Sequence, residues 1–508
     1  MNLLSSTTVF SFYTLISRVL GYIRDILIAF FMGTSVLADA FFVAFRIPNT
    51  FRRLFAEGTF NAAFIPSYTD EKINSKDKGK IFADEVLSIL TIALLFLVLL
   101  IEIFTPYFVF LIAPGFYSEI EKFEIAVELT RITFPFLLFV SLSSFFSGIL
   151  NSNNKFAAAA AAPIILNIIL ILFLIISYFY NLNFAKSLSI GVTLSGILQL
   201  IFLIYFTKKY YKPNFIFNLK VSQKIKLFLR KLLPSIFSSG VTQINILIGT
   251  IIASFQTSAV SYLYFADRIY QINLAIAGIA VSTVSLPVLS KALKLEDHSK
   301  VHNIQNKSLE LSLLLSLPAS FGIIISAEHI VNALFGYGSF NESDVRLTAL
   351  ALKFFGFGIP AFAILKIFSN MFFARDNTKT PFYVSLMIVI LNISISLSFF
   401  REFGFIIIPI STSISSWFGI IIYILLLKNR KFFKFETKTI FNILKIFFST
   451  ILMSILLLFL TDYFYDKLDY SQNFKFFYLL LVITIVAIVY FISCYLLGVL
   501  NFRRFKTI

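Results

Sequence analysis

The sequence predicts an all-α polytopic membrane protein, and three observations support that prediction. Of the 508 residues, 58% are hydrophobic and only 14% are charged, whereas soluble domains carry about 25% charged residues. The mean hydropathy is +0.88. Apolar stretches of about 20 residues recur along the whole chain, and each is long enough to cross the hydrocarbon core of a bilayer.

The first apolar stretch contains three ionisable residues. "SRVLGYIRDILIAFF" at 17–31 includes Arg18, Arg24 and Asp25. A cleavable signal peptide has a basic start and an uninterrupted apolar centre. Residues 1–16 contain no Lys or Arg, and the apolar stretch itself contains the charges. We therefore expect the first helix to be retained.

Hydropathy predicts about fourteen helices. Their estimated bounds, in chain order, are 7–32, 36–50, 83–112, 127–150, 158–180, 187–207, 232–255, 259–289, 307–335, 345–373, 381–400, 404–427, 438–461 and 475–500. Segment 51–66 is less regular: it contains Arg52, Arg53 and Glu57 and ends at Pro66. It fits either a continuation of the second helix or a turn that lines a cavity.

The net charge of +17 is distributed in a way that indicates membrane topology rather than a nucleic-acid partner. Basic residues gather at 208–231, at 428–434 and in the tail at 503–506, whereas 119–128 and 462–469 are mainly acidic. Because basic loops of membrane proteins face the cytoplasm, this alternation places both termini inside. It also requires an even number of helices.

A shift of 222 residues aligns the chain with itself. "VAFRI" at 43–47 falls on "FADRI" at 265–269, so Arg46 aligns with Arg268. We expect two six-helix lobes related by a pseudo-two-fold axis along the membrane normal, a plan of secondary transporters that places the substrate site between the halves. The predicted segments are an N-terminal lobe at 1–220, a C-terminal lobe at 221–434 and a terminal helix pair at 435–508.

Several ionisable residues of the first lobe have uncharged counterparts in the second. Under the same shift, Arg18, Arg24, Asp25 and Asp39 align with Gly240, Ile246, Leu247 and Ser261. A purely architectural role would more naturally occur in both halves. The asymmetry therefore favours a specialised polar surface in the first lobe.

Charges inside a membrane must face a water-filled cavity or pair with one another, because each costs about 2.5–3.5 kcal/mol in lipid. Salt bridges that only hold the bundle together are one explanation for these charges. The set is nevertheless mainly basic: Arg18, Arg24, Arg46, Arg52, Arg53 and Arg268 stand against Asp25, Asp39, Glu57 and Asp267. Since Arg suits bidentate recognition of phosphate, we predict an anionic, phosphate-bearing ligand.

Enzyme motifs are weak in this sequence. His298 and His302 have i,i+4 spacing, but "HSKVH" lacks the Glu of a zinc protease motif, and we place it in a basic cytoplasmic loop. We predict no metal site, no cofactor and no catalytic residue. Cys494 is the only cysteine, so it forms no disulfide within the chain, and we interpret it as a packing residue.

Three stretches resemble the lipid II flippase family (MurJ, also called MviN). They are "SRVLGYIRD" at 17–25, "DAFFVAFRIPNTFRRLFAEGTFNAAFIP" at 39–66 and "YFADRI" at 264–269, with support from "GILNSNNKF" at 148–156, "LFGYGSF" at 334–340 and "RDNTKTP" at 375–381. The family belongs to the superfamily of multidrug, oligosaccharidyl-lipid and polysaccharide exporters. The resemblance implies two six-helix lobes plus a terminal pair.

The resemblance also implies a function. The family moves undecaprenyl-pyrophosphate-linked disaccharide-pentapeptide (lipid II) across the bacterial cytoplasmic (inner) membrane by alternating access. Lipid II and membrane lipids are thus the expected partners, and peptidoglycan-synthesis or division proteins are possible further ones. Carried onto this chain, the substrate-binding residues are Arg18, Arg24, Arg52, Arg53 and Arg268, and the supporting or gating residues are Asp25, Asp39, Glu57, Arg46 and Asp267.

Two further implications concern the second half. The terminal pair would form a groove for the polyprenyl chain. The family commonly has a carboxylate at the position of Asn377, so a cation site built on that carboxylate is not expected here.

Two alternatives stay open from the residues. The first is an exporter of another polysaccharide-linked lipid, or of a drug, from the same superfamily. A cavity for cationic drugs would be net negative, whereas this set is net positive. The second is a membrane scaffold or a subunit of an enzyme complex whose charges serve only helix packing.

Overall fold

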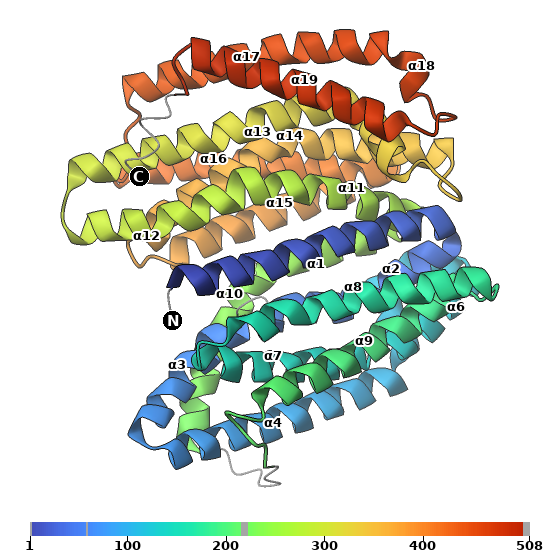
Figure 1. Cartoon of the computed structure of the whole chain (residues 1–508), viewed down its shortest axis with the longest axis vertical. Coiled ribbons are helices and arrows are strands. Elements are labelled where there is room, and N and C mark those ends of the chain that lie inside the picture. Colours follow the sequence, from blue (N-terminus) through green and yellow to red (C-terminus); the bar gives the residue numbers. More distant parts are fainter. Residues whose placement is uncertain (1–2, 57–58, 215–221, 501–508) are drawn as a thin grey trace. The chain divides into compact units, whose positions relative to one another are not determined.

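The computed structural model describes residues 3–56, 59–214 and 222–500, and every regular element in these ranges is a helix (Figure 1). The predicted all-α class is therefore confirmed. The elements up to residue 253 are α1 (Leu3–Met32), α2 (Val36–Ala56), α3 (Thr59–Asn74), α4 (Lys76–Ile103), α5 (Thr105–Ile112), η1 (Pro114–Ser118), α6 (Ile120–Thr133), α7 (Phe136–Ser152), α8 (Phe156–Phe179), α9 (Phe184–Thr207) and α10 (Gln223–Ala253).

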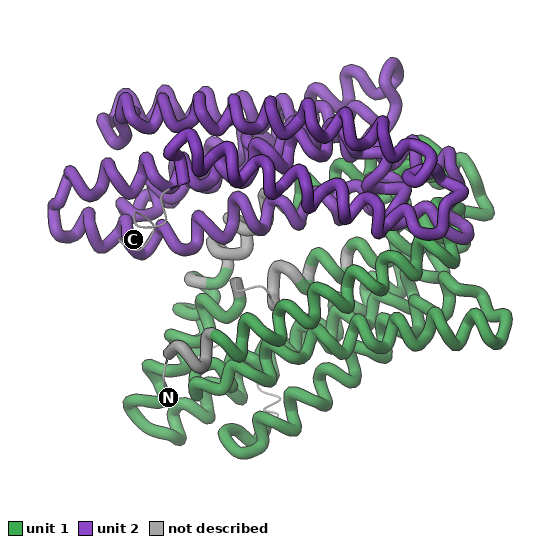
Figure 2. The backbone as a smooth tube through the Cα atoms, turned by 45° about the horizontal axis from the view of Figure 1, so that its top comes forward, with its two compact units in different colours: residues 1–261 green, residues 262–508 purple. Residues whose placement is uncertain are grey.

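The later elements complete the helical chain. They are α11 (Ala259–Leu274), η2 (Ala275–Ala280), α12 (Val281–Lys294), α13 (His298–Phe335), α14 (Glu342–Phe373), α15 (Lys379–Phe403), η3 (Gly404–Ile406), α16 (Ile407–Asn429), α17 (Thr437–Tyr463), α18 (Tyr465–Leu468) and α19 (Lys475–Leu496). The chain divides into two compact units, Met1–Ser261 and Tyr262–Ile508 (Figure 2).

Ten helical stretches among the described residues are long and apolar enough to cross a membrane. One of them, Lys379–Asn429, contains two of the helices that hydropathy predicts, and α1 and α10 are not among the ten. The predicted class of a multi-pass membrane protein is thus confirmed. The count of fourteen stays a prediction.

The helices of the second half recur where the 222-residue shift places them. Shifting α8 (Phe156–Phe179) gives 378–401, and α15 spans Lys379–Phe403. Shifting α9 (Phe184–Thr207) gives 406–429, and α16 spans Ile407–Asn429. The internal repeat seen in the sequence is therefore also a repeat of helix positions.

The first unit is built on close helix packing. α1 packs along α8, α8 along α9, and α9 along α7. Small residues permit such approach: a Cβ added at Gly196 of α9 would lie 2.8 Å from the ring of Phe136 on α7. Helix α10 packs against α3 and α4, where Phe228 meets the rings of Phe64 and Phe82 edge-on.

Several predicted helices are interrupted. The stretch predicted at 83–112 is α4 and α5, separated at Phe104 just before Pro106, and the one at 127–150 is α6 and α7, separated by Phe134 and Pro135. Proline removes a backbone donor and clashes with the preceding turn, so a helix breaks or kinks there. Between α11 and α12 the chain forms the π-helical turn η2.

The start of α13 and the helices in segment 51–66 bear on two predictions made from the sequence. The placement of His298 and His302 in a loop is wrong, because α13 begins at His298 and its N-cap Asp297 accepts a hydrogen bond from the Lys300 N–H. Segment 51–66 is helical where it is described: α2 continues to Ala56, and α3 begins at Thr59.

The second unit is organised around the hairpin of α13 and α14. α16 packs on α14, while α17 and α19 pack on α13. Ile446, Val482 and the fully buried Cys494 belong to the core between α13, α17 and α19, so Cys494 is a packing residue as predicted. Trp417, the only tryptophan, lies on α16 and donates its indole N–H to the carbonyl of Phe357 on α14 at 3.0 Å.

Candidate functional site

Arg24 and Asp25 form a buried ion pair on α1. The Arg24 Nη2 atom lies 2.7 Å from Asp25 Oδ1, and Nε donates to the same oxygen at 3.0 Å. Successive residues on a helix point in different directions. Here the long guanidinium reaches back to its neighbour because both groups are buried and need a partner.

The same guanidinium also binds α8. Arg24 Nη1 donates to Asn167 Oδ1 at 2.9 Å, and Asn167 Nδ2 donates to the Ser17 carbonyl at 2.8 Å. The arrangement holds the Arg24 fork in a defined orientation across the α1–α8 contact. Asn167 was not among the predicted site residues, although an amide inside the apolar run "PIILNIIL" is a detectable signal.

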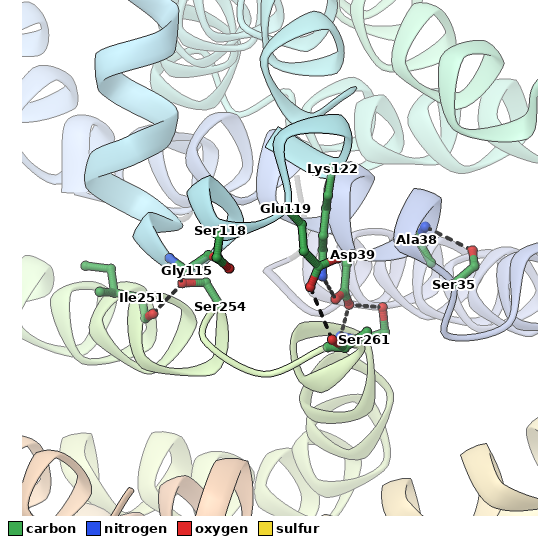
Figure 3. Close-up of polar contacts among 11 residues, drawn as sticks. Ser35, Ala38, Asp39, Gly115, Ser118, Glu119, Lys122, Ile251, Ser254 and Ser261 are labelled. Atoms are coloured by element: carbon green, nitrogen blue, oxygen red, sulfur yellow. Dashed lines mark hydrogen bonds and ion pairs between the residues drawn. The ribbon is translucent and has the colours of Figure 1, made fainter. Parts of the chain in front are cut away.

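Asp39 on α2 is the centre of a second buried cluster (Figure 3). The Lys122 amine of α6 lies 2.8 Å from Asp39 Oδ2, and both residues are buried. Asp39 Oδ1 accepts hydrogen bonds from the Ser261 hydroxyl at 2.6 Å and from its backbone N–H at 2.9 Å. Asp39 thereby joins α2, α6 and the start of α11.

Lys122 has a second contact, because its amine lies 4.2 Å from the centre of the Phe116 ring. Lys122 was not predicted as a site residue, since it is the one basic residue of an acidic segment that resembles a solvent-exposed loop. Its burial depends on tertiary contacts that no local pattern contains.

The connection between α10 and α11 lies against η1 and α6 (Figure 3). The Gly115 N–H donates to the Ser254 hydroxyl at 3.0 Å, and a Cβ at Gly115 would lie 2.3 Å from the Ser254 carbonyl oxygen. Only glycine permits this approach. Glu119 accepts a hydrogen bond from the Thr257 hydroxyl at 3.3 Å, so the connection is held at two points before it reaches Ser261.

The predicted arginines of α2 lie beyond Asp39 along the helix. Arg46 and Arg52 are half-buried, and Arg52 Nε donates to Asn49 Oδ1 at 3.0 Å. The side chain of Arg53 and the residue Glu57 lie outside the described parts of the chain. Arg18 of α1 is exposed.

The predicted residues of the second unit lie on α11. Arg268 donates from Nη2 to the Tyr264 hydroxyl at 2.8 Å, and its guanidinium lies 4.8 Å from the centre of that ring. Asp267 accepts a hydrogen bond from Gln271 one turn later. Both charged groups are half-buried, so they are less enclosed than Arg24 and Asp25.

No cluster of three or more His, Cys, Asp or Glu side chains that could hold a metal is present in the described ranges. The Asn377 side chain precedes α15 and bonds to Thr380 in the first turn of that helix. Its Oδ1 accepts from the Thr380 N–H at 3.1 Å. Its Nδ2 donates to the Thr380 hydroxyl at 3.0 Å. The fold, the internal repeat and the buried charges of α1, α2 and α6 together define a multi-pass membrane transporter.

The profile of the family described as "Lipid II flippase MurJ" matches residues 28–501. The chain therefore belongs to the lipid II flippase family, a family of transporters of the bacterial inner membrane. A relative from Rickettsia prowazekii (strain Madrid E), named "Probable lipid II flippase MurJ", is 38% identical, and the alignment covers 99% of each chain. A relative of the same name from Haemophilus influenzae is 31% identical over 96% of this chain and 98% of its own.

Solved structures show the same fold. A "Lipid II flippase MurJ, inward closed conformation" matches with a TM-score of 0.81 and 30% identity, covering 95% of this chain and 97% of the other. An inward-facing multidrug resistance MATE family transporter matches with a TM-score of 0.67 and 16% identity, covering 82% and 94%. At that identity the second likeness concerns the fold alone.

Proposed function

We propose that this chain carries lipid II from the cytoplasmic to the outer leaflet of the bacterial inner membrane by alternating access. One observation carries the proposal: α1 buries an arginine whose fork is held by Asp25 and Asn167, in a chain whose relatives are named lipid II flippases. A guanidinium in an apolar setting is well suited to a pyrophosphate, because it offers parallel N–H donors and stays charged.

The head-group ligands in this proposal are Arg18, Arg24, Arg52, Arg53 and Arg268. Arg18 is exposed and Arg52 and Arg268 are half-buried, so an anion can approach them. Arg24 is buried and engaged, and a phosphate oxygen must replace Asp25 as its acceptor before it can bind substrate. Arg24 is therefore the member whose partner changes during the transport cycle.

Asp25, Asp39, Glu57, Arg46 and Asp267 are the orienting or gating members. Asp39 is fully buried against Lys122 and Ser261, which leaves it no surface for a lipid head group. It acts by holding α2 and α6 to the start of α11. Asp25 acts directly on Arg24 by supplying a carboxylate that competes with the substrate.

The wider organisation is also a proposal. The lobes at 1–220 and 221–434 would move against each other, and the pair at 435–508 would contact the polyprenyl chain. Both termini would face the cytoplasm, because basic segments of membrane proteins favour that side and the tail at 503–506 is basic. Reporter fusions to the two termini test the orientation, and an outward signal from either one overturns it.

The experiment is a lipid II translocation assay in vesicles that contain purified protein. Arg24→Ala and Arg268→Ala should abolish translocation while the protein still inserts, since each removes a charged donor. Lys467→Ala, at an exposed lysine in a connection of the second unit, is the matched control and should transport normally. Normal transport by both arginine variants would contradict the proposal.

Two further measurements separate the alternatives. If the chain exports another polysaccharide-linked lipid, depletion in cells causes that precursor, and not lipid II, to accumulate inside. If the charges serve only packing, replacing the buried pair together by neutral residues of similar size, Arg24→Met with Asp25→Asn, preserves transport, whereas the proposal expects transport to fail because no guanidinium remains at that position to bind the pyrophosphate.

A further inference from the structure

Lys475, the first residue of α19, is a buried amine that the proposed transport site does not use. Only 1% of the residue is exposed. It lies between two connections of the second unit: the turn at 336–341 between α13 and α14, and the segment at 464–474 between α17 and α19. The first of these contains the "GYGSF" stretch at 336–340.

Neutral oxygen atoms satisfy the amine completely. Lys475 Nζ donates to Asn332 Oδ1 at 3.0 Å, to the Gly336 carbonyl at 2.6 Å and to the Tyr470 carbonyl at 2.8 Å. An ammonium has three N–H donors, so each of them has an acceptor. Within the described parts of the chain, no carboxylate forms an ion pair with this amine.

Two aromatic rings complete the surroundings of the charge. The amine lies 4.2 Å from the centre of the Tyr337 ring and 4.6 Å from that of Tyr470. The electron-rich face of an aromatic ring attracts a cation, most strongly where water is excluded. Backbone carbonyls, an amide oxygen and two tyrosine rings therefore form a cage for one ammonium group.

The sequence of the turn fits this cage. A Cβ at Gly336 would lie 2.3 Å from Asn332 Oδ1, so any larger residue displaces one of the three acceptors. Gly338 has a φ of 61°, which a side chain disfavours. The two glycines of "GYGSF" thus bracket the tyrosine that faces the amine.

The same residues also join the two connections directly. Asn332 Nδ2 donates to the Leu468 carbonyl at 2.9 Å, and the Tyr470 hydroxyl donates to the Phe340 carbonyl at 2.8 Å. Leu468 itself packs against Ala333 and Leu479. Contacts from α13, from the turn and from the α18–α19 connection all converge on Lys475.

We propose that the turn at 336–341, with Asn332 and Tyr470, is a receptor for the Lys475 ammonium that docks the terminal helix pair onto the α13–α14 hairpin. Lys475 is the positioning residue of this joint: it touches no substrate, and it fixes where the α17–α19 pair begins its return through the membrane. A methionine at 475 fills similar space but leaves three acceptors without a donor.

Thiol reactivity tests the docking without any transport measurement. A Leu468→Cys reporter in a Cys494→Ser background lies next to the cage, whereas the native Cys494 reports on the core near the far end of α19. Lys475→Met should raise maleimide labelling at position 468 about tenfold or more, because the loss of charged hydrogen bonds favours local opening. The control Lys467→Met, at an exposed lysine, should leave labelling unchanged.

A second variant covers the case in which Lys475→Met fails to fold. Tyr337→Leu removes one ring of the cage and should raise labelling at 468 by a smaller factor, while the exposed Tyr463→Leu should not. Each cage variant is also made in the chain that retains the native Cys494. If Cys494 stays protected from maleimide there, the rest of the α17–α19 pair is still packed. Labelling at 468 that is unchanged by both cage variants overturns the proposal.

A transport readout is added last and rests on the proposed function. Lys475→Met should reduce lipid II translocation, and Lys475→Arg should restore part of it, since the charge remains but the planar fork fits three separate acceptors poorly. If labelling rises and no variant or native chain moves lipid II, the docking stands and the transport proposal fails. If transport is normal and labelling is unchanged, the docking fails alone.

Discussion

Among the residues whose burial the structure describes, two lysines are almost completely buried, and they are stabilised in different ways. Lys122 in the first unit is 2% exposed and pairs with the Asp39 carboxylate at 2.8 Å. Lys475 in the second unit is 1% exposed and binds only neutral oxygens. Each amine also lies 4.2 Å from an aromatic ring centre, that of Phe116 or Tyr337.

The two lysines show that a buried cation can be stabilised either by a charged side chain or by neutral oxygen acceptors. An ion pair depends on the charge of a second side chain, so any event that removes the carboxylate leaves an unpaired cation in an apolar site. The three acceptors of the Lys475 amine carry no charge that could be lost, and the Asp469 carboxylate acts on the amine only through space. The Lys122 joint is therefore sensitive to chemistry at Asp39, whereas the Lys475 joint depends on the shape of one turn.

Asp39→Ala is expected to have the largest effect, because it leaves the buried Lys122 without a counter-charge. Breaking one side of a buried pair costs about 3–5 kcal/mol in free energy of unfolding. Thermal or denaturant unfolding of the purified protein in detergent measures the loss. Asp462→Ala, at an exposed carboxylate, is the control, and equal stability of the two variants would contradict the assigned role of the pair.

Replacing both partners should cost less than replacing either one. In the double variant Asp39→Leu with Lys122→Met no uncompensated charge remains, although the Ser261 N–H and hydroxyl lose their acceptor. Residues in direct contact couple by about 0.5–3 kcal/mol. A double-mutant cycle of unfolding free energies measures the coupling, and strictly additive costs would show that the two groups act independently.

Gly336→Ala tests the neutral acceptors of Lys475 for comparison with the ion pair of Lys122. The new Cβ displaces Asn332 Oδ1, so one neutral acceptor of Lys475 is lost, at a cost of about 1–3 kcal/mol. The unfolding free energy should therefore fall by less than in Asp39→Ala. Gly322→Ala on α13, whose Cβ would meet nothing within 4 Å, is the matched control and should be neutral or stabilising.

Ser471→Ala is expected to have the smallest effect, in the connection next to the cage. Hydrogen bonds from the Ser471 hydroxyl and backbone N–H hold the pKa of the Asp469 carboxyl below its ordinary value. A depressed pKa stabilises the folded state above the unfolded pKa, and that gain disappears as the pH falls through the folded value.

The variant should thus melt slightly lower than the native chain at pH 7, and the two should converge in acid. Ser343→Ala removes a hydroxyl that bonds to the neutral Asn341 amide, so its effect should not depend on pH. A melting difference for Ser471→Ala that persists in strong acid would contradict the electrostatic explanation.

Most helices could be predicted, because each needs about 20 apolar residues and no distant partner. The breaks were harder to see: the apolar stretch predicted as one helix at 83–112 continues past Phe104, and only Pro106 marks the place where α4 ends and α5 begins. The first turns of α13 were missed for the opposite reason. "HSKVH" is polar like a loop, but Asp297 caps it as a helix.

The charged residues likewise divide into those that the sequence reveals and those that only the fold reveals. Arg24, Asp25 and Asp39 were detectable as charges inside apolar helices, and the repeat showed that the second half lacks them. Lys122 was not detectable, since only the fold places it against Asp39. A local pattern identifies a costly group, whereas its partner depends on contacts between distant segments.

The single tryptophan has a practical consequence. Trp417 lies on α16 with its indole N–H bonded to the Phe357 carbonyl of α14, and 43% of it is exposed. Indole fluorescence excited selectively over tyrosine therefore arises from one position in the second unit. Its emission wavelength and quenching by brominated lipids can report on the α14–α16 contact during a transport cycle, with no attached dye.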